Sequence, residues 1–261
     1  MKNPTTKPTV GALALASTLA AATLALLIAK LPAQAAGRNL NPRVFTINST
    51  PYGKTYGEWS AEHWKWTFSF PVDHHPQTDT ADCSAGQSGP VWFLGGTFTT
   101  TSEGATVIGR ATRNCTVPVG KALFFPIIDS ECSTLEGNGT TDAELRGCAA
   151  FFQDHANSMT CVIDGVPVRN LESYRVQLPL FTYGPLPGNN ILASFGIDAP
   201  AGSTSPSVSD GVFIMLAPLS AGSHTIHFTG ALTLSVANGD PFDLDFRLDI
   251  TYHLTVAPGS H

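Results

Sequence analysis

Apolar and polar residues alternate most regularly near the C-terminus of the chain. From residue 242 to residue 256 every second side chain is apolar, beginning with Phe242 and ending with Val256, and the residues between are polar or charged. Successive side chains of a strand point to opposite faces, so this pattern predicts a long strand with one wet face. We expect this strand in an antiparallel sheet, because parallel strands are usually covered on both faces.

Other apolar segments of strand length are separated by turn residues. Residues 224–236 precede the last strand, and the Asn-Gly-Asp-Pro turn at 238–241 predicts a hairpin between the two. A second hairpin is expected across Asp164 and Gly165. Further strand candidates are residues 91–98, 122–128, 160–163, 174–178 and 212–216. About eight to ten such strands are typical of an antiparallel β-sandwich or jelly roll.

Two segments have a helical pattern instead. Residues 58–68 contain neither Gly nor Pro and repeat large side chains on one helical face. Residues 143–159 follow a Thr-Thr-Asp sequence that can cap a helix, and Glu144 falls in the first turn. Residues 189–210 are polar and rich in Ser, Pro and Gly, which predicts a surface loop. We therefore expect a mainly β domain with an N-terminal Trp-rich helix and one further helix.

The first 35 residues have the features of an export signal. Lys2 and Lys7 precede an apolar run at 10–29, and Ala33-Gln34-Ala35 has the small residues that a signal peptidase accepts. Cleavage there would leave residues 36–261 as one disulfide-stapled β-sandwich domain, secreted or periplasmic and without a membrane attachment. An uncleaved anchor is the alternative, because the apolar run approaches the ~20 residues that span a bilayer.

Five cysteines in an exported chain predict two disulfides and one free thiol. Cys83 and Cys115 flank a segment of paired strands, and Cys132 and Cys148 bracket a polar loop, so we pair them in that order. Cys161 is then expected as a buried free thiol. No two cysteines have the close spacing of a zinc site, and the histidines show no known ligand spacing, so we expect no metal site.

The net charge of the chain limits the classes of partner that we expect it to bind. Fourteen Lys and Arg against 20 Asp and Glu give a net charge of −6, and removal of the leader makes it more negative. Nucleic acids and anionic membrane surfaces both require a basic face, so we expect neither as a partner. The chain also lacks phosphate-binding loops, dinucleotide fingerprints and a Gly-x-Ser-x-Gly elbow, and we expect no cofactor.

The Trp-rich segment is the first candidate site. It places Trp59, Trp64 and Trp66 beside candidate catalytic residues Glu58, Glu62 and His63, and we include Trp92 among the candidate binding residues. Aromatic rings could stack on sugars while a carboxylate or imidazole moves protons. Alternatively the helix covers one end of the sandwich, with its tryptophans in the core and its glutamates in solvent.

Asp129 and Glu131 form the second candidate site. They follow the apolar strand at 122–128, where the chain leaves the core. A buried strand holds such carboxylates rigidly, which suits catalysis. A strand that emerges into solvent also becomes polar without any function, and both interpretations stay open here.

Three segments together resemble a group of exported bacterial proteins for which no activity is established. These segments are residues 86–98 (GQSGPVWFLGGTF), 115–128 (CTVPVGKALFFPII) and 223–228 (SHTIHF). The resemblance covers most of the chain beyond the leader. It implies a bacterial, extracytoplasmic protein and transfers no catalytic residue.

Two functions of different class follow from the sequence. The first is a module that binds an extracellular glycan or cell-envelope component through its aromatic residues. The second is an extracellular hydrolase or lyase that acts on a polysaccharide through carboxylates near the Trp-rich helix. Burial of the tryptophans bears on this choice. Exposed rings beside convergent carboxylates would favour the enzyme, and rings in the core would remove most of the support for both functions.

Overall fold

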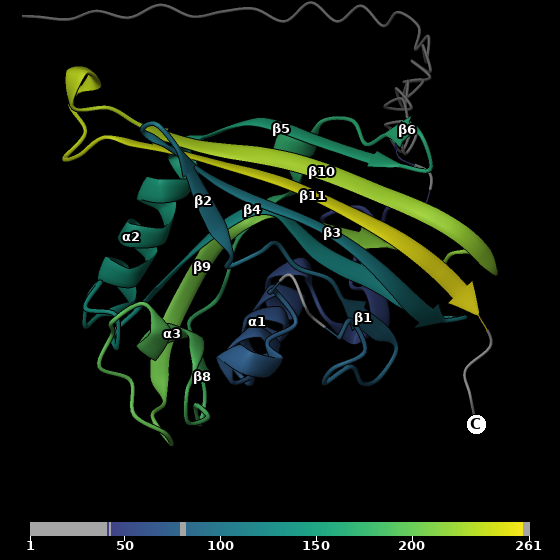
Figure 1. Cartoon of the computed structure of the whole chain (residues 1–261), viewed down its shortest axis with the longest axis horizontal. Coiled ribbons are helices and arrows are strands. Elements are labelled where there is room, and N and C mark those ends of the chain that lie inside the picture. Colours follow the sequence, from purple (N-terminus) through teal and green to yellow (C-terminus); the bar gives the residue numbers. More distant parts are fainter. Residues whose placement is uncertain (1–40, 42, 79–81, 258–261) are drawn as a thin grey trace, which may run out of the picture. The chain divides into compact units, whose positions relative to one another are not determined.

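Two mixed β-sheets pack face to face and form the body of the protein (Figure 1). The computed structural model describes residues 41, 43–78 and 82–257. The first sheet has the strand order β1-β4-β9-β7, with β8 also paired to β9. Its strands are β1 (Val91–Phe93), β4 (Ala122–Ser133), β7 (Arg175–Gln177), β8 (Phe181–Tyr183) and β9 (Ser205–Leu216).

The second sheet has the order β2-β3-β11-β10-β5-β6. Its strands are β2 (Thr100–Glu103), β3 (Thr106–Pro118), β5 (Ala156–Ile163), β6 (Val166–Pro167), β10 (Gly222–Leu234) and β11 (Leu244–Ala257). The sheets meet through rings such as those of Phe125 on β4 and Phe228 on β10, which stack with their centroids 5.4 Å apart. The predicted β-sandwich is therefore confirmed.

The sheets are mixed, whereas the sequence predicted antiparallel pairing. β11 is antiparallel to β10, as the turn between them requires, but it is parallel to β3 on its other side. β1 and β4 are also parallel. β11 nevertheless keeps one wet face: Leu248, Ile250 and Tyr252 are buried, whereas Arg247 and Asp249 are exposed. The strand begins at Leu244, so Phe242 lies outside it with 43% of its surface exposed.

Three α-helices and four short 3-10 turns complete the described chain. The helices are α1 (Tyr56–Thr67), α2 (Asp142–Asp154) and α3 (Ile191–Ser194), and the 3-10 turns are η1 (Pro51–Gly53), η2 (Val72–His74), η3 (Leu171–Tyr174) and η4 (Val236–Asn238). α1 and α2 both begin with a capping box, formed by Thr55 with Glu58 and by Thr141 with Glu144. η1 precedes α1, so the Trp-rich helix is not the N-terminal element.

Two predicted segments differ from the structure in their type of secondary structure. The second helix ends at Asp154 rather than at Met159, and the residues after it form β5, which pairs with β10. The predicted loop at 189–210 contains α3 and the first half of β9. For β5 and β9, hydrogen bonds to strands distant in sequence decide the local structure, and local composition does not report such partners.

The sequence predicted paired strands between Cys83 and Cys115 but did not locate β3 within that segment. Its inward positions include Ala111, Arg113 and Cys115, which are buried although they form no apolar stripe. The absence of large apolar side chains removes the alternation that marks a half-buried strand.

Both predicted disulfides are present. Cys83–Cys115 joins the loop before β1 to β3, and Cys132–Cys148 joins β4 to α2. Cys161 is a free thiol on β5, and burial raises its pKa to about 12.

The predicted leader, residues 1–35, lies outside the described residues. None of the helices in the described part of the chain has the length and apolar composition of a membrane-spanning helix.

Candidate active or binding site in the α1 cleft

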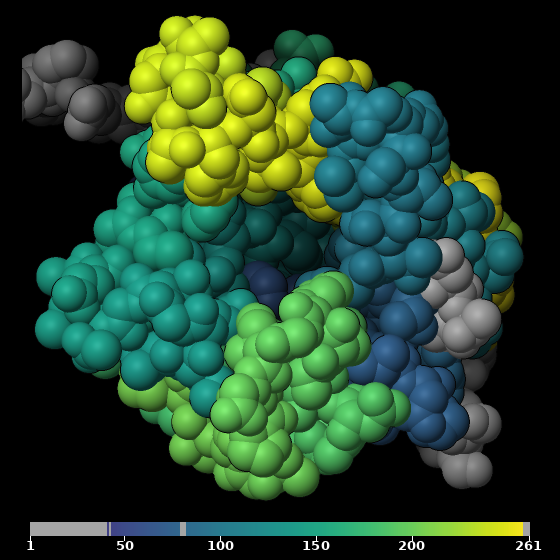
Figure 2. Space-filling model, turned by 60° about the vertical axis from the view of Figure 1, so that its left-hand side comes forward, coloured from purple at the N-terminus to yellow at the C-terminus, as the bar shows by residue number. Residues whose placement is uncertain are grey.

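A deep hollow opens on one face of the protein (Figure 2). Segments of β2, α2, α3 and the β10–β11 region surround it in this view, and part of the α1 region is visible at its base. The corresponding cavity has a volume of about 270 Å³. Its aromatic lining consists of Trp64, Phe98, Phe195 and Phe246, and its polar lining of His63, Gln77, Thr97, Thr100 and Asp129. We call this cavity the α1 cleft.

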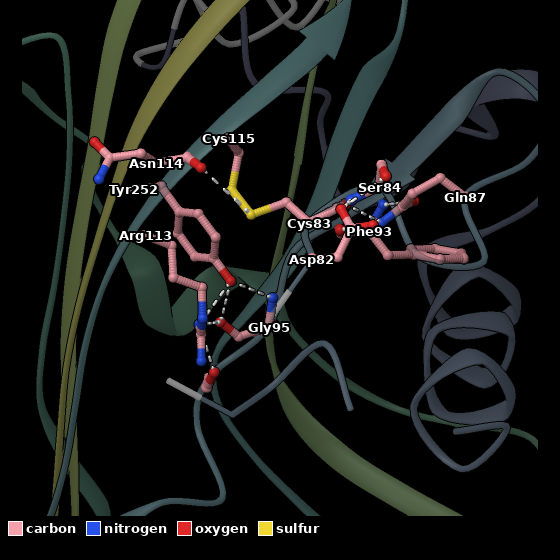
Figure 3. The surroundings of a disulfide bond; sticks show 11 residues. Asp82, Cys83, Ser84, Gln87, Phe93, Gly95, Arg113, Asn114, Cys115 and Tyr252 are labelled. Carbon is pink, nitrogen blue, oxygen red and sulfur yellow. Dashed lines mark hydrogen bonds between the residues drawn. A yellow bond between two sulfur atoms is a disulfide. The ribbon is translucent and has the colours of Figure 1, made fainter. Parts of the chain in front are cut away.

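One wall of the α1 cleft is the chain between β1 and β2, which includes Gly96 and Phe98. The Tyr252 hydroxyl donates to the Gly95 carbonyl at 2.8 Å, and Arg113 Nη1 donates to the Gly96 carbonyl and to the Tyr252 hydroxyl, each at 2.9 Å. Figure 3 shows how Arg113 and Tyr252 converge on this segment, beside the Cys83–Cys115 disulfide. Side chains from β3 and β11 therefore fix the wall in place.

The second wall of the α1 cleft is the part of β4 that contains Pro126, Ile128 and Asp129, and a bulge lies within it. The pairing of β4 with β9 shifts between Pro126 and Ile128, and both of these residues line the cleft together with Asp129. Bulges of this kind redirect the side chains that follow them. Asp129 then pairs with Gly211 on β9, where a Cβ atom would collide with the Asp129 side chain. The glycine leaves the room that Asp129 occupies.

Asp129 carries an unusual carboxyl group. Burial is the largest influence on it and raises its pKa to about 7, although the nearby Trp64 indole acts in the opposite direction. Asp129 as a whole is half-buried, but its Oδ2 atom is fully buried and has no hydrogen-bond partner. The Nε1 atom of Trp64 is also buried and also has no hydrogen-bond partner. The indole therefore lies near the carboxyl without forming a regular hydrogen bond. A carboxyl in this state can act as a proton donor or acceptor near neutral pH.

His63 supplies a third polar atom without a hydrogen-bond partner. Its Nε2 lies 2.8 Å from the Leu94 carbonyl oxygen, so Nε2 carries the hydrogen and Nδ1 is left as an acceptor. Nδ1 is buried without a partner, and the residue is only 2% exposed. Burial lowers the pKa of His63 to about 4, which keeps the ring neutral. His63 therefore lines the cleft as a neutral ring and brings no positive charge to it.

Glu131 lies two residues beyond Asp129 but belongs to a different hydrogen-bond network. Its Oε1 accepts a short hydrogen bond from Ser207, while Glu136 accepts from the Ser133 hydroxyl at 2.6 Å. Burial, reinforced by the neighbouring Glu136, raises the pKa of Glu131 well above its ordinary value. Both carboxyl groups of the second sequence candidate are thus strongly perturbed, and Asp129 is the one that lines the cleft.

The two glutamates of the Trp-rich helix lie elsewhere. Glu58 is exposed and accepts hydrogen bonds from the Thr55 backbone at 2.7 Å and the Thr55 hydroxyl at 2.9 Å, which lower its pKa. Glu62 forms surface ion pairs with Lys54 at 3.2 Å and Lys65 at 3.4 Å. The structure brings neither carboxylate to the cleft, and both have structural partners on the outer face of α1.

Most of the tryptophans are in the core. Trp59 and Trp66 are each 7% exposed and Trp92 is 6% exposed, so these rings present no face to a glycan. The Trp59 indole donates to the Pro51 carbonyl at 2.9 Å, and the Trp66 indole to the Ala85 carbonyl at 3.1 Å. Trp64 is half-buried and lines the cleft. Trp59 and Trp66 therefore lie in the core, as in the alternative in which the helix covers the sandwich, and Trp92 is buried as well.

Sequence reasoning missed the other cleft residues. Phe195 was placed in a surface loop, Phe246 in the core face of the last strand, and Phe98 at the end of a strand. In the structure Phe195 is 57% exposed, and Phe98 and Phe246 are half-buried. A large aromatic residue within the otherwise polar segment 189–210 is the sequence signal that could have identified Phe195. Nothing local could have placed it opposite β11.

A second cavity, of about 320 Å³, lies beside β5 and β6 and includes Asp164 in its lining. Asp164 accepts a hydrogen bond from the Thr225 backbone at 2.9 Å and pairs with His224 at 2.7 Å. Its carboxylate is therefore already satisfied, whereas the α1 cleft combines unpartnered polar atoms with a perturbed carboxyl. The α1 cleft is the better candidate site.

Within the described ranges, no three side chains of His, Cys, Asp or Glu are grouped as ligands of a metal ion. Comparison with known proteins found no matching family model, no matching curated protein and no matching solved structure. The function must therefore be argued from the chemistry of the cleft.

Proposed function

We propose that the protein binds a saccharide unit of an extracellular or cell-envelope glycan in the α1 cleft. The observation that carries this proposal is the combination of aromatic walls with unpartnered polar atoms in one cavity. A sugar ring has apolar C–H faces that pack on aromatic side chains, and hydroxyl groups that need hydrogen-bond partners. Buried polar atoms that lack partners cost free energy, and a ligand that supplies these partners recovers it.

The geometry suits one sugar unit better than a long segment of polymer. The volume of about 270 Å³ is at the lower end of the range for small-molecule sites. Nδ1 of His63 and Nε1 of Trp64 are buried, so a sugar hydroxyl reaches them only after a small movement of these side chains. The exposed ring of Phe195, at the end of α3, offers a contact for the next unit of the chain.

A glycan array followed by titration calorimetry tests the proposal. Phe195→Ala removes an exposed ring of the cleft, and we expect it to weaken the binding of any glycan found by about tenfold. Phe242→Ala is the matched control, because Phe242 is also an exposed phenylalanine but does not line the cleft. Equal affinities for the two variants, or no glycan bound by the wild-type protein, would overturn the proposal.

A second candidate function is hydrolysis or elimination on a polysaccharide. The observation that favours it is the pKa of Asp129, which burial raises to about 7 and which suits a general acid. Glu131 on the same strand would be the second carboxyl group, and its commitment to Ser207 and Glu136 weakens this candidate.

Product analysis by mass spectrometry on each bound glycan separates the two functions. If the protein is an enzyme, Asp129→Asn should lower turnover by about a hundredfold or more. Asp249→Asn, on the outer face of β11, should leave turnover unchanged. Binding without any product from the wild-type protein would reject the enzyme.

A further inference from the structure

The carboxyl group of Asp129 lies in the cleft without a positively charged partner. Among the cleft-lining residues that the structure describes there is no lysine and no arginine, and His63 is held neutral by burial. Oδ2 of Asp129 is buried and has no hydrogen-bond partner. A buried carboxylate without a counter-ion is unfavourable, and the group stays protonated or acquires a cation from outside.

The walls around Asp129 also suit a cation. Trp64, Phe98, Phe195 and Phe246 come from four separate parts of the chain and all line the same cavity. The face of an aromatic ring carries partial negative charge and attracts ammonium groups, most strongly where water is excluded. Aromatic rings and one unpaired carboxylate together form an environment that favours an organic cation over a neutral group of equal size.

We infer that the α1 cleft binds an organic ammonium group, with Asp129 as its counter-ion and the aromatic side chains as its walls. This inference rests on the proposed function and deepens it, since the saccharide unit would then carry an amine, as an amino sugar or an alkylammonium-substituted sugar does. Anionic sugars are disfavoured, because their carboxylate or phosphate would meet Asp129 without a neighbouring base. A metal ion is disfavoured as well, because the aromatic walls offer no ligand atoms.

Matched pairs of small ligands test the charge directly. Choline and 3,3-dimethyl-1-butanol have the same shape and differ in the quaternary nitrogen, and glucosamine differs from N-acetylglucosamine in its free amine. Calorimetry on the purified protein at pH 8 should show that each cation binds about tenfold or more tightly than its neutral partner. Glucuronic acid should not bind.

Substitutions then show which residues cause the preference for a cation over its neutral isostere. Asp129→Asn should abolish the preference for choline over its neutral isostere, whereas Asp249→Asn, an exposed carboxylate outside the cleft, should retain it. Phe195→Leu keeps an apolar side chain but removes the ring, and it should reduce the affinity for choline more than that for the isostere. Thermal melting of each variant checks that the fold is intact.

The pH dependence provides a readout that a loss of packing would not mimic. The ionisable neighbours of Asp129 are His63 on α1 and Glu131 on its own strand, whereas the linings from β11, α3 and the β1–β2 connection are uncharged. The affinity for choline, whose own charge does not titrate, should therefore rise between pH 5 and pH 8 as Asp129 loses its proton at about 7. In Asp129→Asn it should not change.

The outcomes separate this inference from the proposed function. Equal binding of the cation and of its neutral isostere would overturn the inference, while the binding of neutral glycans would still support the proposed function. Binding of choline without any saccharide would support the ammonium site and reject the glycan. If no ligand of either kind binds, both are rejected.

Discussion

Asp129 on β4 and Gly211 on β9 are direct neighbours across the first sheet, and the side chain of one occupies the space that the other leaves free. A Cβ atom at position 211 would meet both Cα and Cβ of Asp129 and the ring of Phe213. The carboxyl group that lines the α1 cleft is thus held in place by a residue that has no side chain.

Gly211→Ala should therefore destabilise the protein. The added methyl group overpacks the sheet, and we expect a loss of about 1–3 kcal/mol in the free energy of unfolding, measured by urea denaturation. Gly147→Ala is the control, because Gly147 lies within α2 and a Cβ atom there meets nothing within 4 Å. Alanine should stabilise that helix by about 0.5–1 kcal/mol. Equal effects of the two substitutions would show that Asp129 does not depend on the glycine.

The inner face of β11 should dominate its contribution to stability. Ile250 is fully buried, and Ile250→Ala should lower the free energy of unfolding by about 2–5 kcal/mol. His253 lies on the outer face of the same strand, and His253→Ala should change it by about 0.5 kcal/mol or less. Phe246 is less suitable for this comparison, since it is half-buried at the edge of the cleft. Similar losses at positions 250 and 253 would contradict the observed register.

Mapping of peptides without reduction should recover Cys83 linked to Cys115 and Cys132 linked to Cys148. Cys161 should be alkylated only after denaturation, because it is buried. The bridges span 32 and 16 residues, and each should stabilise the fold by about 3 to 4 kcal/mol through the restriction of the unfolded chain. Reduction should therefore lower the melting temperature. Recovery of Cys161 in a bridge would refute this pairing.

The stability of the protein should depend on pH through Asp129. Its pKa rises from an ordinary value of about 3.9 in the unfolded chain to about 7 in the folded protein. Between these values the folded state binds the extra proton, so this group makes the protein less stable as the pH rises from 4 to 7, and has no further effect above the folded pKa. Asp129→Asn should therefore become more stable relative to the wild type over that range.

The comparison with Asp129→Asn is needed because other groups titrate in the same window. Burial lowers the pKa of His63 and His75 to about 4, so these residues favour the folded state increasingly as the pH rises towards their ordinary pKa of 6.5. Their effect opposes that of Asp129 and is common to both proteins. Denaturant unfolding of both at several pH values therefore reports Asp129 together with its electrostatic effect on Glu131, whose raised pKa includes a contribution from Asp129. A constant difference would mean that Asp129 titrates normally.

The sequence by itself determined the features that depend on neighbouring residues. The alternation around Ile250 identified β11, the Thr-Thr-Asp sequence that ends at Asp142 identified the start of α2, and the positions of the cysteines allowed the correct pairing. The first two follow from the periodicity of a strand and from hydrogen bonds within one helical turn, and the two bridges join cysteines that are 32 and 16 residues apart. Each is set within a short stretch of chain, so its signal is visible in the residue order.

Only the tertiary structure decided which candidates line a common cavity. Glu62 and Asp129 are both acidic residues beside apolar segments, yet Glu62 forms surface ion pairs and Asp129 lines a cavity. The cavity is built from α1, β4, the end of α3 and β11, which meet only when the two sheets pack. The pKa of Asp129 then follows from burial, and burial depends on contacts between residues far apart in the chain. No local pattern encodes those contacts, and for this reason the sequence named Asp129 and His63 as candidates but could not separate them from Glu58 and Trp59.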